Sequence, residues 1–157
     1  MLKKNFFDSK WNDEHANEDE IRYCNFFHKT SPIRTKNFPI AFFQIVGIFA
    51  EDCDYHIQSC YIDDKRFFCD GYYKQQVCNF MLRYGIKDNE LIIAKVGFIH
   101  KREGKMTELY RVLKKIQKRY KCGKISIENA NSTAMKNWCI KNGFVQHPKY
   151  ENNFIEP

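Results

Sequence analysis

The sequence predicts a mixed α/β fold, and three observations lead to this class. The chain has 157 residues, of which 43% are apolar and 29% charged, so it is long enough for one domain with its own core. Residues 91–145 follow the order strand, helix, strand, helix and extended segment. That order predicts a parallel strand pair joined by a right-handed crossover over residues 91–129. Earlier in the chain, residues 38–50 and 55–62 are typical of two antiparallel strands.

The N-terminal region predicts a helix followed by a buried strand. Residues 14–31 carry apolar side chains at helical spacing and stop before Pro32, so we assign residues 1–37 to a divergent helical region. Residues 38–50 are aromatic and β-branched throughout, which indicates a strand that is buried on both faces. Residues 55–62 alternate and are expected to be its antiparallel neighbour.

The remaining elements follow from spacing as well. Residues 73–84 predict a helix that ends at Gly85, because Val77, Phe80, Met81 and Tyr84 share one helical face. In the second half we expect an apolar strand at 91–100, an amphipathic helix at 104–120 and a short strand at 124–128. A second helix at 131–142 and a final extended piece at 143–145 follow.

Seven cysteines form no pattern of a metal site. Their number is odd, no CxxC occurs, and a single C-x-x-H at Cys53 and His56 is a weak signal. We therefore expect no metal and mostly buried, free thiols in a reducing cytosol.

No membrane segment is expected. Asp8 and Lys10 interrupt the N-terminal apolar residues, and the longest apolar run, 38–50, is shorter than the roughly 20 residues of a bilayer span. The expected location is the cytoplasm, or a virion if the protein is viral. Frequent Lys, Asn, Ile, Phe and Tyr suggest an A+T-rich genome, bacterial or viral.

The positive charge is concentrated in one segment. The chain has a formal charge of +7, and residues 100–124 contain ten Lys and Arg against Glu103 and Glu108, a net charge of +8. At the head of this segment, residues 101–106 connect a strand to a helix. Free amides and the macrodipole at a helix N-terminus, with a glycine and basic neighbours, favour binding of a phosphate.

The same segment resembles a known family. Lys101-x-x-Gly104-x-Met106-x-x-Leu109 is similar to the Arg/Gln-x-x-Gly-x-Gly/Ala-x-x-Leu signature of the GNAT-type N-acetyltransferases. The stretch from Ile125 through Asn131 and Ala134 to Lys141-x-Gly143-Phe144 resembles the later part of that family's pattern. The resemblance covers about a third of the chain, from residue 91 to 144.

This resemblance implies a central, mostly antiparallel sheet with helices on both faces, and acetyl-CoA as the acyl donor. Residues 91–147 would form the acyl-CoA-binding half of a single domain. The pyrophosphate would lie on the amides of residues 102–107, and the pantetheine would run beside Ile92–Phe98. The residues implied to contact the donor are Phe98, Ile99, Lys101, Arg102, Glu103, Gly104, Lys105, Met106, Thr107 and Asn131.

Three positions depart from the family pattern. Met106 replaces a small residue and narrows the expected space for the pyrophosphate, and Lys101 lacks the planar fork of an arginine. The tyrosine that often serves as the general acid in this family corresponds to Cys139 if the pattern is counted back from Gly143, or to Trp138 if it is counted forward from Asn131. Cys139 is therefore the candidate acid, with core packing as the competing interpretation and Tyr150 as a substitute.

The candidate bases are Glu128 and His100. Both follow strands at their carboxyl ends, where ligands of open α/β sheets bind. A base must remove a proton from the attacking amine. His100 is also a candidate phosphate contact, and Glu128 is also a candidate salt-bridge partner of the basic helix.

Three functions compete on the sequence alone. The first is an acyl-CoA-dependent N-acyltransferase that acts on a small molecule or a protein amine. The second is a GNAT-like module without catalysis, with a binding or viral assembly role and a possible homodimer. The third is a nucleic-acid binder that uses the basic helix, which is disfavoured because no stacking aromatics are interleaved with its basic residues.

Overall fold

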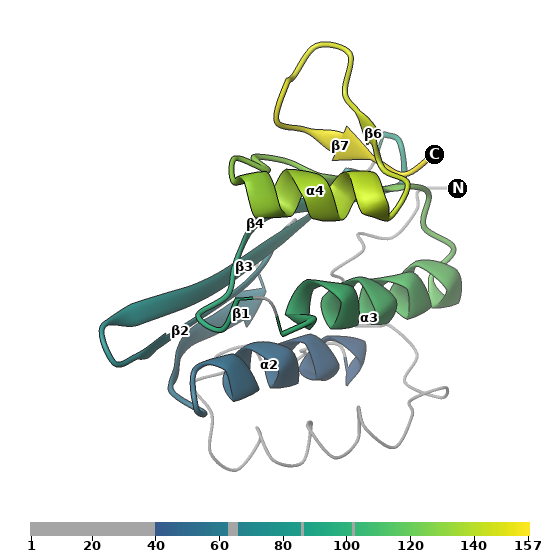
Figure 1. Ribbon diagram of the computed structural model, residues 1–157. Helices are drawn as coiled ribbons and strands as arrows, with labels where there is room; N and C mark the ends of the chain where they lie inside the picture. The colour runs from purple at the N-terminus through teal and green to yellow at the C-terminus, as the bar shows by residue number, and fades with distance from the viewer. Residues whose placement is uncertain (1–39, 63–65, 86, 102) are drawn as a thin grey trace.

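The computed structural model describes residues 40–62, 66–85, 87–101 and 103–157, and the helix predicted within residues 14–31 lies outside them. The elements, labelled as in Figure 1, are the helices α2 (Ile40–Asp52), α3 (Lys105–Arg119) and α4 (Thr133–Lys141). The strands are β1 (Ile57–Ile62), β2 (Arg66–Tyr73), β3 (Gln76–Gly85), β4 (Glu90–Gly97), β5 (Ile125–Ile127), β6 (Val145–Gln146) and β7 (Phe154–Ile155).

The strands form one seven-stranded sheet in the order β1-β2-β3-β4-β5-β7-β6. All neighbouring pairs are antiparallel except β4 and β5, which are parallel and are joined through α3. This is the mixed sheet with a parallel strand–helix–strand unit that the sequence predicts. The predicted fold class is therefore confirmed.

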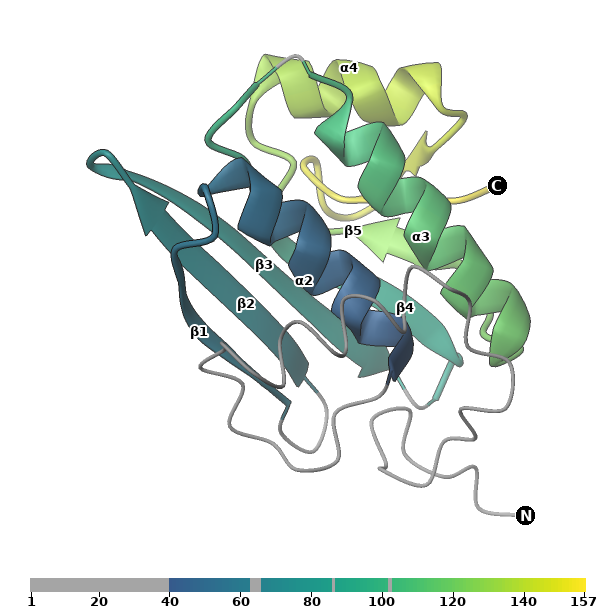
Figure 2. The same cartoon turned by 90° about the horizontal axis from the view of Figure 1, so that it is seen from below.

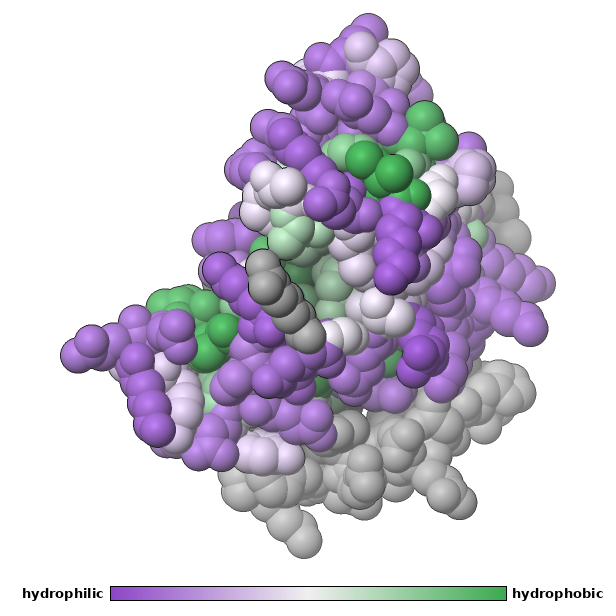
Figure 3. Space-filling view, viewed as in Figure 1, coloured by the Kyte–Doolittle hydropathy of each residue, from purple (hydrophilic) through white to green (hydrophobic). Residues whose placement is uncertain are grey.

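The helices lie in two layers. Figure 1 shows α4 above the strands and α2 and α3 below them. Figure 2, seen from below, shows α2 and α3 side by side across the sheet. The core between these two helices and the sheet includes Phe49, Phe67, Phe80, Leu109 and Leu113, each at most 1% exposed. The face shown in Figure 3 is mostly hydrophilic, with smaller hydrophobic patches.

The strand predicted at residues 38–50 is wrong, because this segment forms α2. From Phe42 to Ala50, the buried side chains include Phe42, Phe43, Ile45, Val46, Ile48, Phe49 and Ala50. A helix that is buried almost all round shows no amphipathic period, so composition alone does not separate it from a buried strand. A proline directly before its first residue is typical of a helix start.

The helix predicted at residues 73–84 is also wrong, because this segment forms β3. Cys78, Phe80, Leu82 and Tyr84 are buried in strict alternation, which is the period of a strand. Phe80 and Tyr84 fit both a helical and a strand period, but Val77 is 54% exposed. Gly85 is accordingly the last residue of a strand and not a helix cap.

The strand at residues 55–62 is confirmed as β1, but its antiparallel neighbour is β2, which was not predicted. In the second half, both strands and both helices are confirmed within a few residues. The final extended piece at 143–145 overlaps β6 only at Val145, and the sequence does not predict β7. Six of the seven cysteines lie among the described residues, where all are free and five are buried. No helix among the described residues is long and apolar enough to cross a membrane.

Candidate functional site

The parallel pair at the centre of the sheet is short. Residues 91–93 of β4 pair with residues 125–127 of β5, whereas β4 continues to Gly97. On its other side, β4 stays paired with β3 as far as Gly97. The two parallel strands therefore separate after Ile93, and one side of β4 runs on past the end of β5.

The point of separation carries polar groups. The register between β3 and β4 shifts here, with Met81 opposite Lys95 and Leu82 opposite Ile93, so that Ala94 forms a bulge. The Glu128 amide donates to the Ile93 carbonyl at 2.9 Å, and the Asn129 side-chain amide donates to the Ala94 carbonyl at 3.4 Å. Glu128 and Asn129 thus follow the carboxyl end of β5 and lie beside the bulge, part-way along β4.

The turn after β4 leads into an uncapped helix. Gly104 is the N-cap of α3 at φ 71°, and within the described part of the chain no side-chain cap hydrogen bond forms there. A non-glycine residue rarely adopts this left-handed conformation. Space around Gly104 is open, because a Cβ built there would meet no atom within 4 Å. Amides at an uncapped helix N-terminus are suited to binding an anion, and anion binding at this turn stays a prediction.

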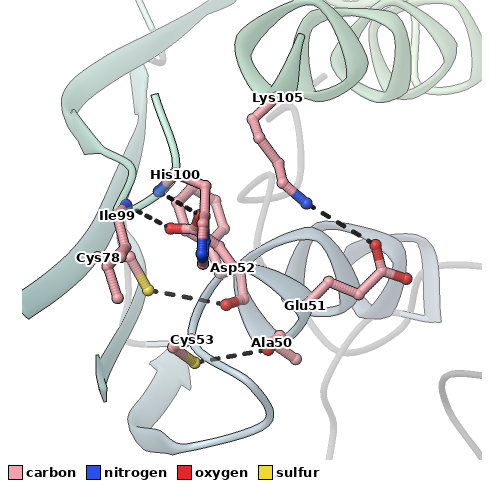
Figure 4. Close-up of polar contacts among 9 residues, drawn as sticks. Ala50, Glu51, Asp52, Cys53, Cys78, Ile99, His100 and Lys105 are labelled. Atoms are coloured by element: carbon pink, nitrogen blue, oxygen red, sulfur yellow. Dashed lines mark hydrogen bonds and ion pairs between the residues drawn. The ribbon is translucent and has the colours of Figure 1, made fainter. Parts of the chain in front are cut away.

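The C-terminus of α2 holds this turn in place. Asp52, the last residue of α2, accepts hydrogen bonds from the backbone amides of Ile99 at 2.6 Å and His100 at 2.9 Å. Its Oδ1 atom also lies 3.1 Å from Nδ1 of the His100 ring. Figure 4 shows Asp52 pointing toward the end of β4, whereas its neighbour Glu51 points toward Lys105 at the start of α3.

Of the basic side chains expected to contact the pyrophosphate, Lys101 is exposed to solvent and Lys105 is largely buried. Lys105 is 16% exposed at its side chain and lies 4.0 Å from Glu51. Lys101 is exposed, as are Glu103 and Thr107. Arg102 lies outside the described residues. Thr107 accepts a hydrogen bond of 3.1 Å from the indole of Trp138, which ties the start of α3 to α4.

The Met106 side chain belongs to the core. It is 8% exposed and lies on the buried face of α3 with Leu109 and Leu113. The sequence predicts that Met106 narrows the space for a pyrophosphate. Because its side chain is buried in the core, it does not fill the open space at Gly104.

The two candidate bases lie at different ends of the site. Glu128 Oε2 lies 2.5 Å from the Arg83 guanidinium of β3, so its ion-pair partner is in the sheet and not on the basic helix. His100 lies in the turn before α3 with a side chain that is 45% exposed. His100 is the sixth residue after the bulge at Ala94, up to roughly 20 Å away along an extended chain.

The remaining predicted residues are placed as follows. Cys139 is fully buried on α4, and this burial raises the pKa of its thiol to about 11. Asn131 is exposed just before α4, and the half-buried Phe98 stacks on Phe49 of α2 with ring centroids 4.9 Å apart. Tyr150 is 59% exposed and packs on His147 in the loop between β6 and β7.

Sequence reasoning missed Asp52, Glu51 and Arg83. Glu51 and Asp52 are the last residues of α2, and Arg83 lies in β3. These are the two segments whose element type the sequence predicts wrongly. The acidic pair Glu51 and Asp52 follows an apolar run in the sequence, but this pattern alone does not indicate that the pair ends a helix. Among the described residues, no group of three or more His, Cys, Asp or Glu is placed to hold a metal ion.

The fold and site define a class: a mixed sheet in which a strand–helix–strand crossover carries an uncapped helix N-terminus beside two separating parallel strands. Among solved structures, the chain is similar to the PaiA N-acetyltransferase from Thermoplasma acidophilum in complex with coenzyme A. The two share 11% sequence identity over 98% of this chain and 87% of that chain, with a TM-score of 0.43. No family model and no curated protein sequence matches the chain.

Proposed function

We propose that the protein is an acyl-CoA-dependent N-acyltransferase that transfers an acetyl group from acetyl-CoA to an amine. The observation that carries the proposal is that β4 continues past its last pair with β5, beside a turn that leads into uncapped helix amides. An extended pantetheine arm fits along the free side of such a strand. The anionic pyrophosphate fits the helix N-terminus and the exposed Lys101.

The surface between α3 and α4 supports this assignment. Figure 3 shows a hollow between α4, above, and the start of α3, below, with less hydrophilic side chains inside it than around it. The hydrogen bond between Thr107 and Trp138 connects the two helices near this place. A hollow of this kind suits a long ligand with an apolar middle and a charged end.

The two ends of the site then have different tasks. With the pyrophosphate at the turn and the arm running back along β4, the thioester lies toward the bulge at Ala94. Glu128 is beside that bulge and His100 is at the phosphate end. We therefore assign the role of base to Glu128, and a donor-binding role to His100.

The reaction requires a simple balance of bonds. The amine nitrogen forms a bond to the thioester carbonyl carbon, and the carbon–sulfur bond breaks. Glu128 takes the proton of the attacking nitrogen, directly or through water. The leaving CoA thiolate takes a proton from solvent water, and the proton on Glu128 returns to solvent, so the transfer balances. Cys139 is a poor source, since it is fully buried.

Binding of the donor is the first test. If acetyl-CoA binds the native state, saturation at 100 times Kd stabilises the fold by about 2.7 kcal/mol, a shift of several degrees in Tm. Absence of a shift with millimolar acetyl-CoA or free CoA would sink the proposal. Lys101→Gln should weaken binding, whereas Lys118→Gln, the same charge change on an exposed site near the other end of α3, should not.

A second candidate is a GNAT-like binding module without catalysis. Two observations favour it: Arg83 engages the Glu128 carboxylate, and the candidate acid Cys139 is buried in the core. This alternative predicts that CoA shifts the Tm but that no acetyl group reaches any amine in a broad acceptor panel. Release of free CoA in the presence of an amine, beyond the rate of hydrolysis, separates the two functions.

A further inference from the structure

The Asp52 carboxylate is a buried acid in an unfavourable position. Its side chain is 0% exposed and it is the last residue of α2, where the negative end of the macrodipole disfavours a second negative charge. Burying a carboxylate is costly unless hydrogen bonds compensate it. Three donors from one short segment supply this compensation: the amides of Ile99 and His100 and the His100 ring.

These contacts fix the backbone that enters the turn. The amides of Ile99 and His100 are consecutive and both point at one carboxylate, which restricts the path of the chain between β4 and α3. Phe49, one turn earlier on α2, stacks on Phe98 with an interplanar angle of 7°. Glu51 reaches Lys105 on the far side of Gly104. The end of α2 therefore holds the turn from both sides, as Figure 4 shows for the two carboxylates.

The same contacts specify the tautomer of His100. A carboxylate only accepts, so Nδ1 of the ring must carry the proton that Asp52 binds. This leaves Nε2 as the nitrogen that can accept a hydrogen bond when the ring is neutral. His147 offers an internal comparison, because its Nδ1 accepts from the Lys149 amide at 3.0 Å and its proton must lie on Nε2.

We propose that Asp52 is a positioning residue of the donor site: it sets the path of the turn that receives the pyrophosphate and orients His100 beside it. This inference rests on the proposed function and extends it to a residue of α2 that does not touch the donor. A purely structural carboxylate would stabilise the fold without any preferential effect on donor affinity. The two cases therefore differ in the affinity for CoA that a variant of Asp52 retains.

The first measurement needs no variant. Nitrogen-15 spectra of the imidazoles in the full chain, recorded well above the ordinary histidine pKa of about 6.5, report which ring nitrogen carries the proton. We expect the Nδ1–H tautomer for His100 and the Nε2–H tautomer for His147. An Nε2–H tautomer at His100 in the wild-type protein would overturn the proposal.

The second measurement compares CoA affinity in two variants. Asp52→Asn places an amide against the donors of the turn, and we expect CoA to bind roughly tenfold more weakly, equivalent to about 1.4 kcal/mol. Ile45→Val, two turns earlier in the buried part of α2, loses stability by a cavity and should bind CoA as the wild type does. Equal affinities for Asp52→Asn and the wild type contradict the positioning role.

Two further outcomes are informative. If Asp52→Asn does not fold, His100→Gln at a half-exposed side chain keeps both backbone bonds and removes the ring contact. It should weaken CoA binding severalfold, and unchanged affinity would overturn the proposal. If the wild type itself binds no CoA, the proposed function fails together with this role. Binding in the wild type that Asp52→Asn leaves intact removes only the role of Asp52.

Discussion

The guanidinium of Arg83 lies 2.5 Å from the carboxylate of Glu128 and joins β3 to the residue that follows β5, across the intervening strand β4. Both side chains are only partly exposed, at 40% and 30%. An ion pair with this exposure contributes little to stability, about 0–1 kcal/mol. Its consequence is geometric, because it fixes one oxygen of Glu128 beside the bulge at Ala94.

Replacing Glu128 tests its assignment as the base. Glu128→Gln keeps the size of the side chain but cannot take a proton from the amine, so turnover should fall by roughly 10²-fold or more. CoA affinity should stay unchanged, because the phosphate end of the site lies beyond the carboxyl end of β4, several residues past the bulge beside Glu128. Steady-state rates measure the loss of turnover, and the CoA-induced shift in Tm measures whether CoA affinity is unchanged. Glu151→Gln, at an exposed residue of the loop between β6 and β7, is the matched control for charge.

The sequence predicts the crossover unit well because its elements differ in period. The helix at residues 104–120 is amphipathic, and the strands on either side are short apolar runs, so each has a distinct signature. The segment at residues 38–50 has no such contrast. It is buried almost all round, and only its tertiary neighbours decide that it is the helix α2.

The error at α2 also explains which site residues were found. The basic turn and Glu128 follow directly from the crossover unit, so local pattern locates them. Asp52 lies 47 residues before Ile99, and Arg83 lies 45 residues before Glu128. These contacts arise only when distant elements pack together. A wrong assignment of α2 and β3 therefore hides the residues that position the site.

The burial of Met106 makes a prediction about donor binding. Met106→Ala should cost about 2–4 kcal/mol, because it leaves a cavity in the core beneath α3. Met106→Leu should cost less than about 1.5 kcal/mol. Neither variant should bind CoA more tightly than the wild type, as measured by calorimetry at a temperature where each is folded. Tighter binding by Met106→Ala would mean that the methionine crowds the pyrophosphate after all.

Gly71 in β2 should tolerate no side chain, because two buried thiols occupy the space beside it. A Cβ at this position would lie 2.5 Å from Cys53 Sγ and 3.1 Å from Cys78 Sγ. We expect Gly71→Ala to lower the free energy of unfolding by about 1–3 kcal/mol. Gly85→Ala in β3 is the control, since its nearest neighbour is an ordinary 3.4 Å away.

A double-mutant cycle assigns this loss to the sulfur. A Cys53→Ala background removes the 2.5 Å contact with Sγ and leaves the longer contacts with Cys53 Cβ at 3.0 Å and Cys78 Sγ at 3.1 Å, so adding Ala at residue 71 should cost less than it does in the wild type. Urea denaturation of the four proteins measures the coupling. Additive losses would show that the strain at residue 71 comes from another neighbour.

The carboxylate of Glu156, directly after β7, is hydrogen-bonded to side chains of α3 and to the first backbone amide of β5. It is 7% exposed and accepts from Tyr110 at 2.5 Å, Lys114 at 3.0 Å and Gln117 at 2.9 Å, and from the Ile125 amide at 3.0 Å. Burial alone would raise the pKa of Glu156, but the hydrogen bonds from these partners outweigh it and lower the pKa below its usual value. Burial and the neighbouring carboxylate raise the pKa of Tyr110 far above its usual range.

This network should make stability depend on pH in acid. Because the pKa of Glu156 is lower in the folded state than in the unfolded state, its contribution is fully present above the unfolded value of about 4.3. The contribution is lost as the pH falls through the lower, folded value. Glu156→Gln should reduce the free energy of unfolding by about 1–3 kcal/mol at pH 7. The difference in Tm between wild type and variant should shrink between pH 5 and about pH 3, and a difference that stays constant over this range would contradict the ionised network.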